Sequence, residues 1–496
     1  MAIKRYTADA DNVITNAYEE NLSTRATGSN MGLSDVLEVF SVYAQADATS
    51  TEYARSLVKF PISSISTDRT AGTIPATGSV SFYLRMFNAE HSETLPKNFK
   101  LVVEAISSSW DEGHGLDMDT YTHSGTSNWI SASSTAAWTS AGGDFHSEPY
   151  YTASFDDGTE DLELDITALV EQWIAGTKSN YGLGVKLTSS HESEARSYYT
   201  KKFFARGSQY FFKRPIIEAR WNSAKKDDRT TFYYSSSLAP AADNLNTLYL
   251  YNYVRGRLRN IPGVGTGNVY VSLYSGSSNN VLPDGDPLTL VADGTYVRSG
   301  ITTVATGGYV ETGIYSASLA ITSAATPLTK MFDVWFSGGD SISGGGVGGG
   351  TLYHTGSIVP TVLTASVNNP STDYVTSITN LKPIYKDSET ARIRVYTRTK
   401  DWNPNIYSKA VATAESRTIE SGSYQVYRLS DGMVVVPYGT GSLLHTQMSY
   451  DVSGNYFDFD MSMLQQGYAY AFQFAYYNGA VGDWLEQPEF FKFRVE

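Results

Sequence analysis

Short runs of alternating apolar and polar residues recur along the chain, and turn-forming residues bound each run. In the first part of the chain they occupy residues 36–43, 53–60, 80–87 and 99–106. Alternation with a period of two places successive side chains on opposite faces of a sheet, which is typical of half-buried strands. The pattern therefore predicts an all-β protein of short strands joined by many turns.

Residues 161–221 predict the closing half of a β-sandwich. A strand at 162–164 is followed by Asp165-Ile166-Thr167, which offers cap residues for a short helix at 168–174. A turn then leads into a strand at 180–187. A last strand at 214–221 has proline only at its entrance, where no ladder hydrogen bond is lost. We therefore expect a jelly-roll-like, antiparallel first domain that contains one short helix.

The apolar positions of these elements predict the interior of that domain. We expect Trp173 to cap the core from the helix, because an aromatic ring buries a large apolar area. Eight further side chains are expected inside: Leu57, Phe60, Leu101, Val103, Ile166, Val170, Leu183 and Val185.

A charged run without apolar periodicity, residues 222–229, predicts a domain boundary. At 496 residues the chain is too long for a single core. Further strands are predicted at 269–274, 313–319, 330–336, 391–398, 423–428 and 468–476. We expect three tandem domains: a β-sandwich over 1–222, an immunoglobulin-like β-sandwich over 223–365 and a C-terminal β-sandwich over 366–496.

The composition agrees with an all-β protein and narrows its partners. The chain has 36 Tyr, 21 Phe and 42 Gly, residues that favour strands and turns. The absence of cysteine excludes disulfides, thiolate metal sites and cysteine nucleophiles. The net charge of −14 disfavours nucleic acid, because neutralising phosphates requires clustered Lys and Arg.

The hydropathy of the chain bears on its compartment. No tract is long and apolar enough to span a membrane, so we expect no membrane insertion. Residues 1–6 turn polar at once and lack the apolar core of a secretory signal. We expect the protein to be made in a cytoplasm.

The densest set of candidate metal ligands lies between Asp111 and His123. Counted from Asp117, an EF-type calcium loop needs a third acid and then glycine at its sixth position, where this chain has Tyr and Thr. The two histidines of the segment lie in a loop rather than on one helix face, as a zinc hydrolase requires. We therefore expect no metal and no cofactor; the residues to test are Asp117, Asp119 and His123.

Motifs of common enzyme classes are missing from the sequence. No Ser lies in a Gly-x-Ser-x-Gly elbow, the histidines are scattered, and no pair of acids stands out as a glycosidase would need. The glycine tract at 344–350 lacks the Lys-Ser/Thr of a phosphate loop. We expect no enzyme activity.

A long polar excursion between residues 110 and 151 leaves the predicted sheet, and loops of this length are generally functional or packed against a partner. Its aromatic side chains include Trp110, Tyr121, Trp129, Trp138 and Tyr150. In one interpretation these rings stack on the sugars of a host-surface glycan, while flanking acids and amides bind the hydroxyls. In the other, Trp110 and Trp138 fold back and cover the end of the sandwich. We favour the second.

The first domain resembles the β-sandwich family called DNRLRE domains, seen in bacterial surface proteins, polysaccharide-active enzymes and phage proteins. The matching motifs are 55–60, Trp110-Asp111-Glu112-Gly113, Asp165-Ile166-Thr167 with Val170 and Trp173-Ile174-Ala175-Gly176, Asn180-Tyr181-Gly182-Leu183, and Arg214-Pro215 with Glu218. The six-residue signature that names the family is absent. The resemblance covers about residues 8–221 and implies a fold but no catalytic residue.

The whole chain is similar in style to virion structural proteins of T4-like, marine tailed phages. The similarity rests on residues 1–12, 24–32 and 455–461. It implies a non-enzymatic virion protein of the tail, baseplate or neck that forms a homo-oligomer within a symmetric assembly and contacts other virion proteins. The alternatives are a capsid decoration protein and a carbohydrate-binding adhesin that touches the host surface. A polysaccharide-cleaving enzyme is the third class.

Overall fold

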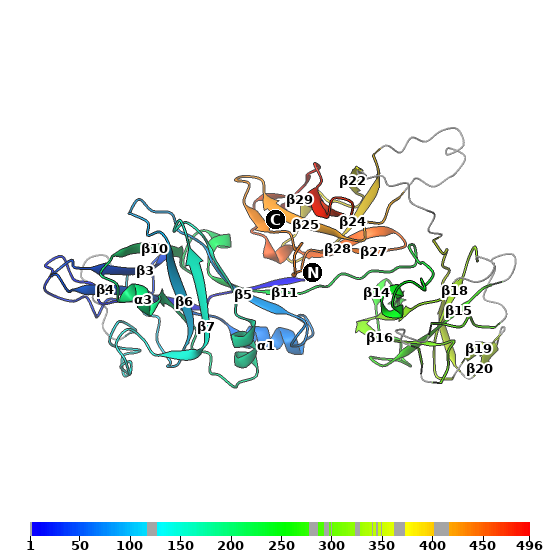
Figure 1. Cartoon of the computed structure of the whole chain (residues 1–496), viewed down its shortest axis with the longest axis horizontal. Helices are drawn as coiled ribbons and strands as arrows, with labels where there is room; N and C mark the ends of the chain where they lie inside the picture. The colour runs from blue at the N-terminus through cyan, green and yellow to red at the C-terminus, as the bar shows by residue number, and fades with distance from the viewer. Residues whose placement is uncertain are drawn as a thin grey trace.

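The computed structural model describes residues 2–116, 126–276, 286–291, 297–298, 300–322, 328–339, 341–343, 346–348, 350–361, 373–400 and 416–496. Strands dominate this part of the chain, and its α-helices are short: α1 (Ile62–Thr70), α2 (Thr167–Ile174) and α3 (Ser189–Glu192). The predicted all-β class is confirmed. Figure 1 shows three groups of strands, with the C-terminal group between the N-terminal and the central ones.

The N-terminal group consists of two antiparallel sheets. One has the order β1 (Ile3–Thr7), β11 (Ile216–Arg220), β5 (Ser81–Met86) and β8 (Leu162–Asp165). The other has the order β10 (Tyr198–Phe204), β3 (Val36–Tyr43), β4 (Thr51–Lys59), β9 (Leu183–Leu187), β6 (Phe99–Ile106) and β7 (Phe145–Phe155), while β2 (Ala10–Thr15) pairs with β4. The chain passes repeatedly between the two sheets, so neither sheet is complete until the whole group has been made.

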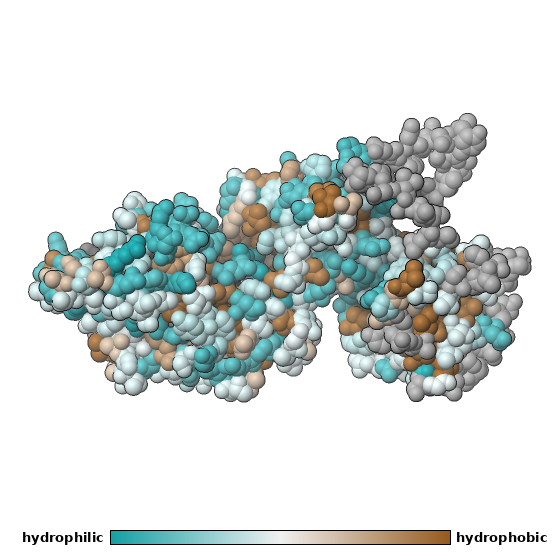
Figure 2. Space-filling view, viewed as in Figure 1, coloured by the Kyte–Doolittle hydropathy of each residue, from teal (hydrophilic) through white to brown (hydrophobic). Residues whose placement is uncertain are grey.

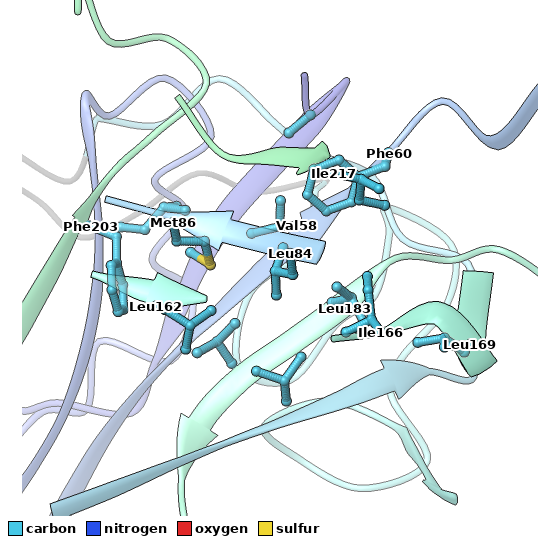
Figure 3. Close-up of a cluster of buried hydrophobic side chains, with 14 of the residues drawn as sticks. Val58, Phe60, Leu84, Met86, Leu162, Ile166, Leu169, Leu183, Phe203 and Ile217 are labelled. Carbon is cyan, nitrogen blue, oxygen red and sulfur yellow. The ribbon is translucent and has the colours of Figure 1, made fainter. Parts of the chain in front are cut away.

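The core of this group lies between its two sheets. In Figure 3, Leu84 of the smaller sheet and Val58 of the larger sheet lie close to each other, and Ile166 lies beside Leu183. All eight side chains expected inside are buried, and Trp173 is only 5% exposed. Leu57 is the one that does not join this core, because it lies on the opposite face of β4 within a cluster of tryptophans.

The central group forms one continuous path of six strands. Their order is β12 (Asn246–Tyr251), β17 (Ile314–Leu319), β16 (Ala305–Glu311), β15 (Val269–Tyr274), β18 (Phe332–Ser337) and β21 (Thr351–Thr355). The first half of β16 pairs with β15 and its second half with β17, so this strand passes from one side of the core to the other. Two small hairpins add β13 (Tyr253–Val254) with β14 (Arg257–Leu258), and β19 (Ser341–Ser343) with β20 (Gly346–Gly348). The immunoglobulin-like assignment stays a prediction.

The C-terminal group is again built from two sheets. One has the order β22 (Tyr374–Ile378), β24 (Thr390–Thr399), β28 (Gly454–Asp460) and β27 (Ser449–Asp451). The other has the order β23 (Ile384–Tyr385), β31 (Phe491–Val495), β29 (Ala469–Asn478), β25 (Gly422–Arg428) and β26 (Val434–Val436), with β30 (Asp483–Glu486) paired to β29. Aromatic rings fill the space between the sheets: Tyr424 and Phe457 stack with their centroids 4.0 Å apart.

Two segments of the N-terminal group also contribute to the C-terminal core. Ile3 of β1, and Phe212 of the 3₁₀ turn η1 (Phe211–Lys213), belong to the same buried cluster as Tyr470 and Phe493. Further 3₁₀ turns are η2 (Ala241–Asn244) and η3 (Met461–Met463). The predicted domain boundaries stay predictions, and the one at 365/366 falls outside the described residues.

We expect Leu84→Ala to lower the free energy of unfolding by about 2–5 kcal/mol, because the side chain is fully buried and its truncation leaves a cavity between the sheets. Urea unfolding followed by tryptophan fluorescence measures the loss. Leu33→Ala, at a position that is 50% exposed, should change stability by less than about 0.5 kcal/mol. Equal effects of the two variants would contradict the core described above.

Candidate functional site

The tryptophans of the long excursion pack on the outer face of the larger N-terminal sheet. Trp110, Trp129 and Trp138 are only 7%, 7% and 6% exposed, and they form a cluster with Leu57 and Ile106. The indole N–H of Trp110 donates to the Tyr181 carbonyl at 2.7 Å, and that of Trp138 donates to the Asn128 carbonyl at 2.8 Å. Both the faces and the polar edges of these rings are therefore engaged within the protein.

This burial bears on the two interpretations of the aromatic loop. A sugar-stacking platform needs an exposed ring face, and the three indoles lack one. They cover the outer face of the larger sheet, whereas the favoured interpretation placed Trp110 and Trp138 over the end of the sandwich. Tyr150, on the edge strand β7, is 50% exposed and lies apart from the cluster, while Tyr121 falls outside the described residues.

A partly buried set of polar contacts holds the start of the excursion in place. The Glu112 carboxylate accepts hydrogen bonds from the backbone N–H of Asp11 at 2.8 Å and from the Arg206 guanidinium at 2.5 Å. The Asn30 side-chain amide donates to the carbonyls of Glu112 and Ser127, both at 2.8 Å. The Glu112 carboxylate of the Trp-Asp-Glu-Gly turn therefore serves to hold the loop in place.

Among the described residues, no group of three or more His, Asp or Glu side chains is arranged to hold an ion. The three residues singled out for testing, Asp117, Asp119 and His123, lie outside the described residues.

The charged run at 222–229, which the sequence predicted as a boundary, is partly buried, with Lys225 and Asp227 buried. Asp227 is 1% exposed and Asp333 of β18 is fully buried. The Arg229 guanidinium lies between them: it donates to Asp227 at 2.8 Å and to Asp333. One cation therefore faces two buried carboxylates, and burial raises the pKa of Asp227 to about 7.

The same segment binds the C-terminal group along the edge of its smaller sheet. The backbone N–H of Asp227 donates to the Tyr450 carbonyl at 3.1 Å, and the N–H of Tyr450 donates to the Lys225 carbonyl at 2.9 Å. The Tyr450 hydroxyl also donates to Asp228 at 2.6 Å. Residues 225–228 thus form a short parallel bridge beside β27, which links the central and C-terminal groups.

Two clefts lie at the seams between the groups. One, with a volume of ≈ 440 Å³, is lined by Lys4, Phe211 and Met463 among others. The other, of ≈ 430 Å³, is lined by residues of all three groups, including Trp221, Glu311 and His445. Both clefts therefore arise where groups of strands meet.

His445 is the most unusual side chain of the second cleft. It is 4% exposed, and neither ring nitrogen has a hydrogen-bond partner. Burial, assisted by the nearby Arg220, lowers its pKa to about 4, so the ring is neutral at neutral pH. Lys225 and Glu311 form an ion pair of 2.9 Å in the same cleft. No sequence pattern indicates this group of residues, because its members are far apart in the chain.

Comparison with known proteins adds no family. No protein-family model matches the chain, and no curated protein matches it significantly. The DNRLRE and phage resemblances therefore stay predictions. Within the described part of the chain, no helix is long and apolar enough to cross a membrane.

We expect the chain to lose stability as the pH rises from about 5 to 8, in part because of Asp227. Its folded pKa of about 7 lies above the unfolded value, so the folded state binds more protons and is favoured at lower pH. Each unit of pKa difference contributes about 1.4 kcal/mol. Asp227→Asn removes this charge and should flatten the decline in urea-unfolding free energy. Asp483→Asn, at an exposed position of β30, is the control. Identical pH profiles for Asp227→Asn and the unmodified chain would contradict the shift.

Proposed function

We propose that the protein is a non-enzymatic structural component of a tailed-phage virion, located in the tail, baseplate or neck. The observation that supports this most is the set of polar contacts that joins the central and C-terminal groups, which we call the polar seam. It consists of the contacts of Arg229 with Asp227 and Asp333 and those of residues 225–228 with Tyr450. A component that transmits force needs contacts that keep its parts in one arrangement. A binding module on a flexible tether does not.

The strength of that seam follows from the cost of breaking it. Removing one partner of a buried ion pair typically costs about 3–5 kcal/mol, because the other charge stays buried without compensation. The contacts of Arg229 with Asp227 and Asp333 are of this kind. A hydrogen bond between the hydroxyls of Tyr251 and Tyr456, at 3.2 Å, adds a further link between the central and C-terminal groups.

The pairing of the buried acids supports a structural role over catalysis. Arg5, Arg85 and Arg220 surround Glu218. In the C-terminal group, Arg392 binds both oxygens of Asp458, at 2.7 and 2.9 Å. A general acid or base must instead be free to exchange a proton with a substrate.

Protein contacts fit the exposed surface better than a glycan does. On the face seen in Figure 2, hydrophobic residues form separate small patches. Exposed apolar side chains include Leu238 at 96%, Val481 at 60% and Phe490 at 50%. Such residues are candidates for contacts with other virion proteins or with further copies of this chain, whereas the three buried indoles offer nothing to a sugar.

Purified particles of the phage that encodes this chain test the proposal. We expect mass spectrometry to detect the chain in them, and cryo-electron microscopy to place it in a symmetric assembly with contacts on the order of 2,000 Å² or more. Density on the capsid surface would favour a decoration protein. Absence of the chain from the particles, or saccharide cleavage by the purified chain, would contradict the proposal.

A matched pair of variants tests the importance of the seam. Arg229→Met leaves two buried carboxylates without their cation and should reduce incorporation into particles several-fold. Arg257→Met removes an equal charge from the exposed hairpin β13–β14 and should be incorporated normally. Equal incorporation of both variants would show that assembly does not depend on the seam.

A further inference from the structure

Lys201, on the edge strand β10, is fully buried inside the N-terminal sandwich. Its ammonium nitrogen lies 5.1 Å from the ring centroid of Phe155 and 4.9 Å from that of Phe203. Phe203 is visible in Figure 3 at the edge of the core, close to Met86 and Leu162. Lysine is almost never fully buried without a special arrangement of partners.

The partners of Lys201 are three uncharged amide oxygens. Its Nζ donates to the side-chain Oδ1 of Asn88 at 2.6 Å, to the Gly158 carbonyl at 2.9 Å and to the Glu160 carbonyl at 2.8 Å. Burial lowers the pKa of Lys201 to about 8, although the charges of Glu160 and Asp161 offset part of this effect. About a tenth of the Lys201 side chains are therefore uncharged amines at pH 7, far more than for an exposed lysine.

An uncharged amine in this position is directed at the Asn88 carboxamide. It has two N–H bonds and one lone pair, and the two backbone carbonyls can accept both N–H bonds. The lone pair then occupies the third position, on the side of the Asn88 Oδ1, so the carboxamide must turn its Cγ toward Nζ before a bond can form. Desolvation of the amine between aromatic rings also increases its nucleophilicity.

We propose that Lys201 and Asn88 form an intramolecular isopeptide bond. The Lys201 Nζ attacks Cγ of Asn88, the Nζ–Cγ bond forms, and the Cγ–Nδ2 bond breaks. Nδ2 leaves as ammonia after gaining one proton, and Nζ loses one proton, so the reaction needs no oxidant, reductant or second substrate.

The Glu160 carboxylate forms no ion pair with Lys201 and acts on it through its charge, so the proton passes from Nζ to the leaving Nδ2. Glu160 exerts the largest favourable charge effect on Lys201. Its Oε1 accepts the backbone N–H groups of Asp156 and Asp157, which fix the side chain, while its Oε2 is buried without a hydrogen-bond partner. On the other side, Asp161 accepts the backbone N–H of Asn88 at 2.7 Å and holds that residue in place.

The bond would connect the two sheets of the sandwich. Lys201 belongs to an edge strand of the larger sheet, and Asn88 follows β5 of the smaller one. The two residues are 113 positions apart, so the bond would enclose strands β6, β7, β8 and β9 in one covalent loop. This inference does not depend on the proposed function.

Intact-mass spectrometry of the purified full-length chain under denaturing conditions tests the proposal. We expect a mass lower than that of the sequence by one ammonia, and tandem mass spectrometry of a digest should find one branched peptide that joins Lys201 to Asn88. Asn88→Asp should lose one water instead, because a carboxylic acid replaces the amide. Lys201→Met and Asn88→Ala should show the full mass of their sequences.

A further variant separates the bond from a purely structural role of a buried lysine. Lys202→Met, which removes the neighbouring lysine that pairs with Glu38 at 2.9 Å, should keep the loss of ammonia. A full-mass unmodified chain would overturn the proposal, as would ammonia loss without the branched peptide.

Discussion

The balance of charge around Arg229 is the constraint on which the arrangement of the molecule depends. A charge removed from water must be compensated by partners fixed at short range. Asp333 is fixed within the core of the central group, where the Trp335 indole N–H also binds it at 2.6 Å. Arg229 therefore has essentially one acceptable position, and its segment runs directly on to the backbone contacts with Tyr450. The need to pair the buried Asp333 with a cation thus orients the central and the C-terminal groups relative to each other.

The same principle operates between the N-terminal and C-terminal groups. Burial alone would raise the pKa of Glu218, but the guanidinium groups of Arg5, Arg85 and Arg220 hold it well below its usual range. Arg5 also donates to the Val435 carbonyl of the C-terminal group at 2.5 Å. Hydrogen-bonded charges accept few alternative geometries, whereas apolar surfaces can slide past one another. The polar contacts at both boundaries therefore determine how the groups of strands are oriented, in addition to holding them together.

The sequence predicted the strands well because half-buried strands leave a local pattern. The expected strand at 99–106 is β6 to the residue, and the short helix differs from α2 only at its first residue. Local alternation also identified the interior, although it could not tell which face of β4 each buried residue joins, as Leu57 shows.

The seams and the Lys201 site could not be predicted in the same way. Arg229 and Asp333 are 104 positions apart, and Lys201 and Asn88 are 113 apart. A buried charge looks like a solvated one in the sequence, since only its distant partner distinguishes the two. The position of the Trp110 and Trp138 rings was likewise left open, because an aromatic loop has the same composition whether it covers a sheet or meets a ligand.

The placement of strand β1 has a consequence for the order in which the chain can fold. Ile3 packs in the same cluster as Val495, and its strand pairs with β11, which ends at Arg220. Its backbone must wait until β11 has been made, and its side chain must wait for the segment that holds Val495. Contacts of such long sequence separation form slowly, because the entropy cost of closing a long loop is incurred before the packing contacts can offset it. The C-terminal core therefore stays incomplete until β31 has been made, and the docking of β1 makes the folding of the two groups depend on each other.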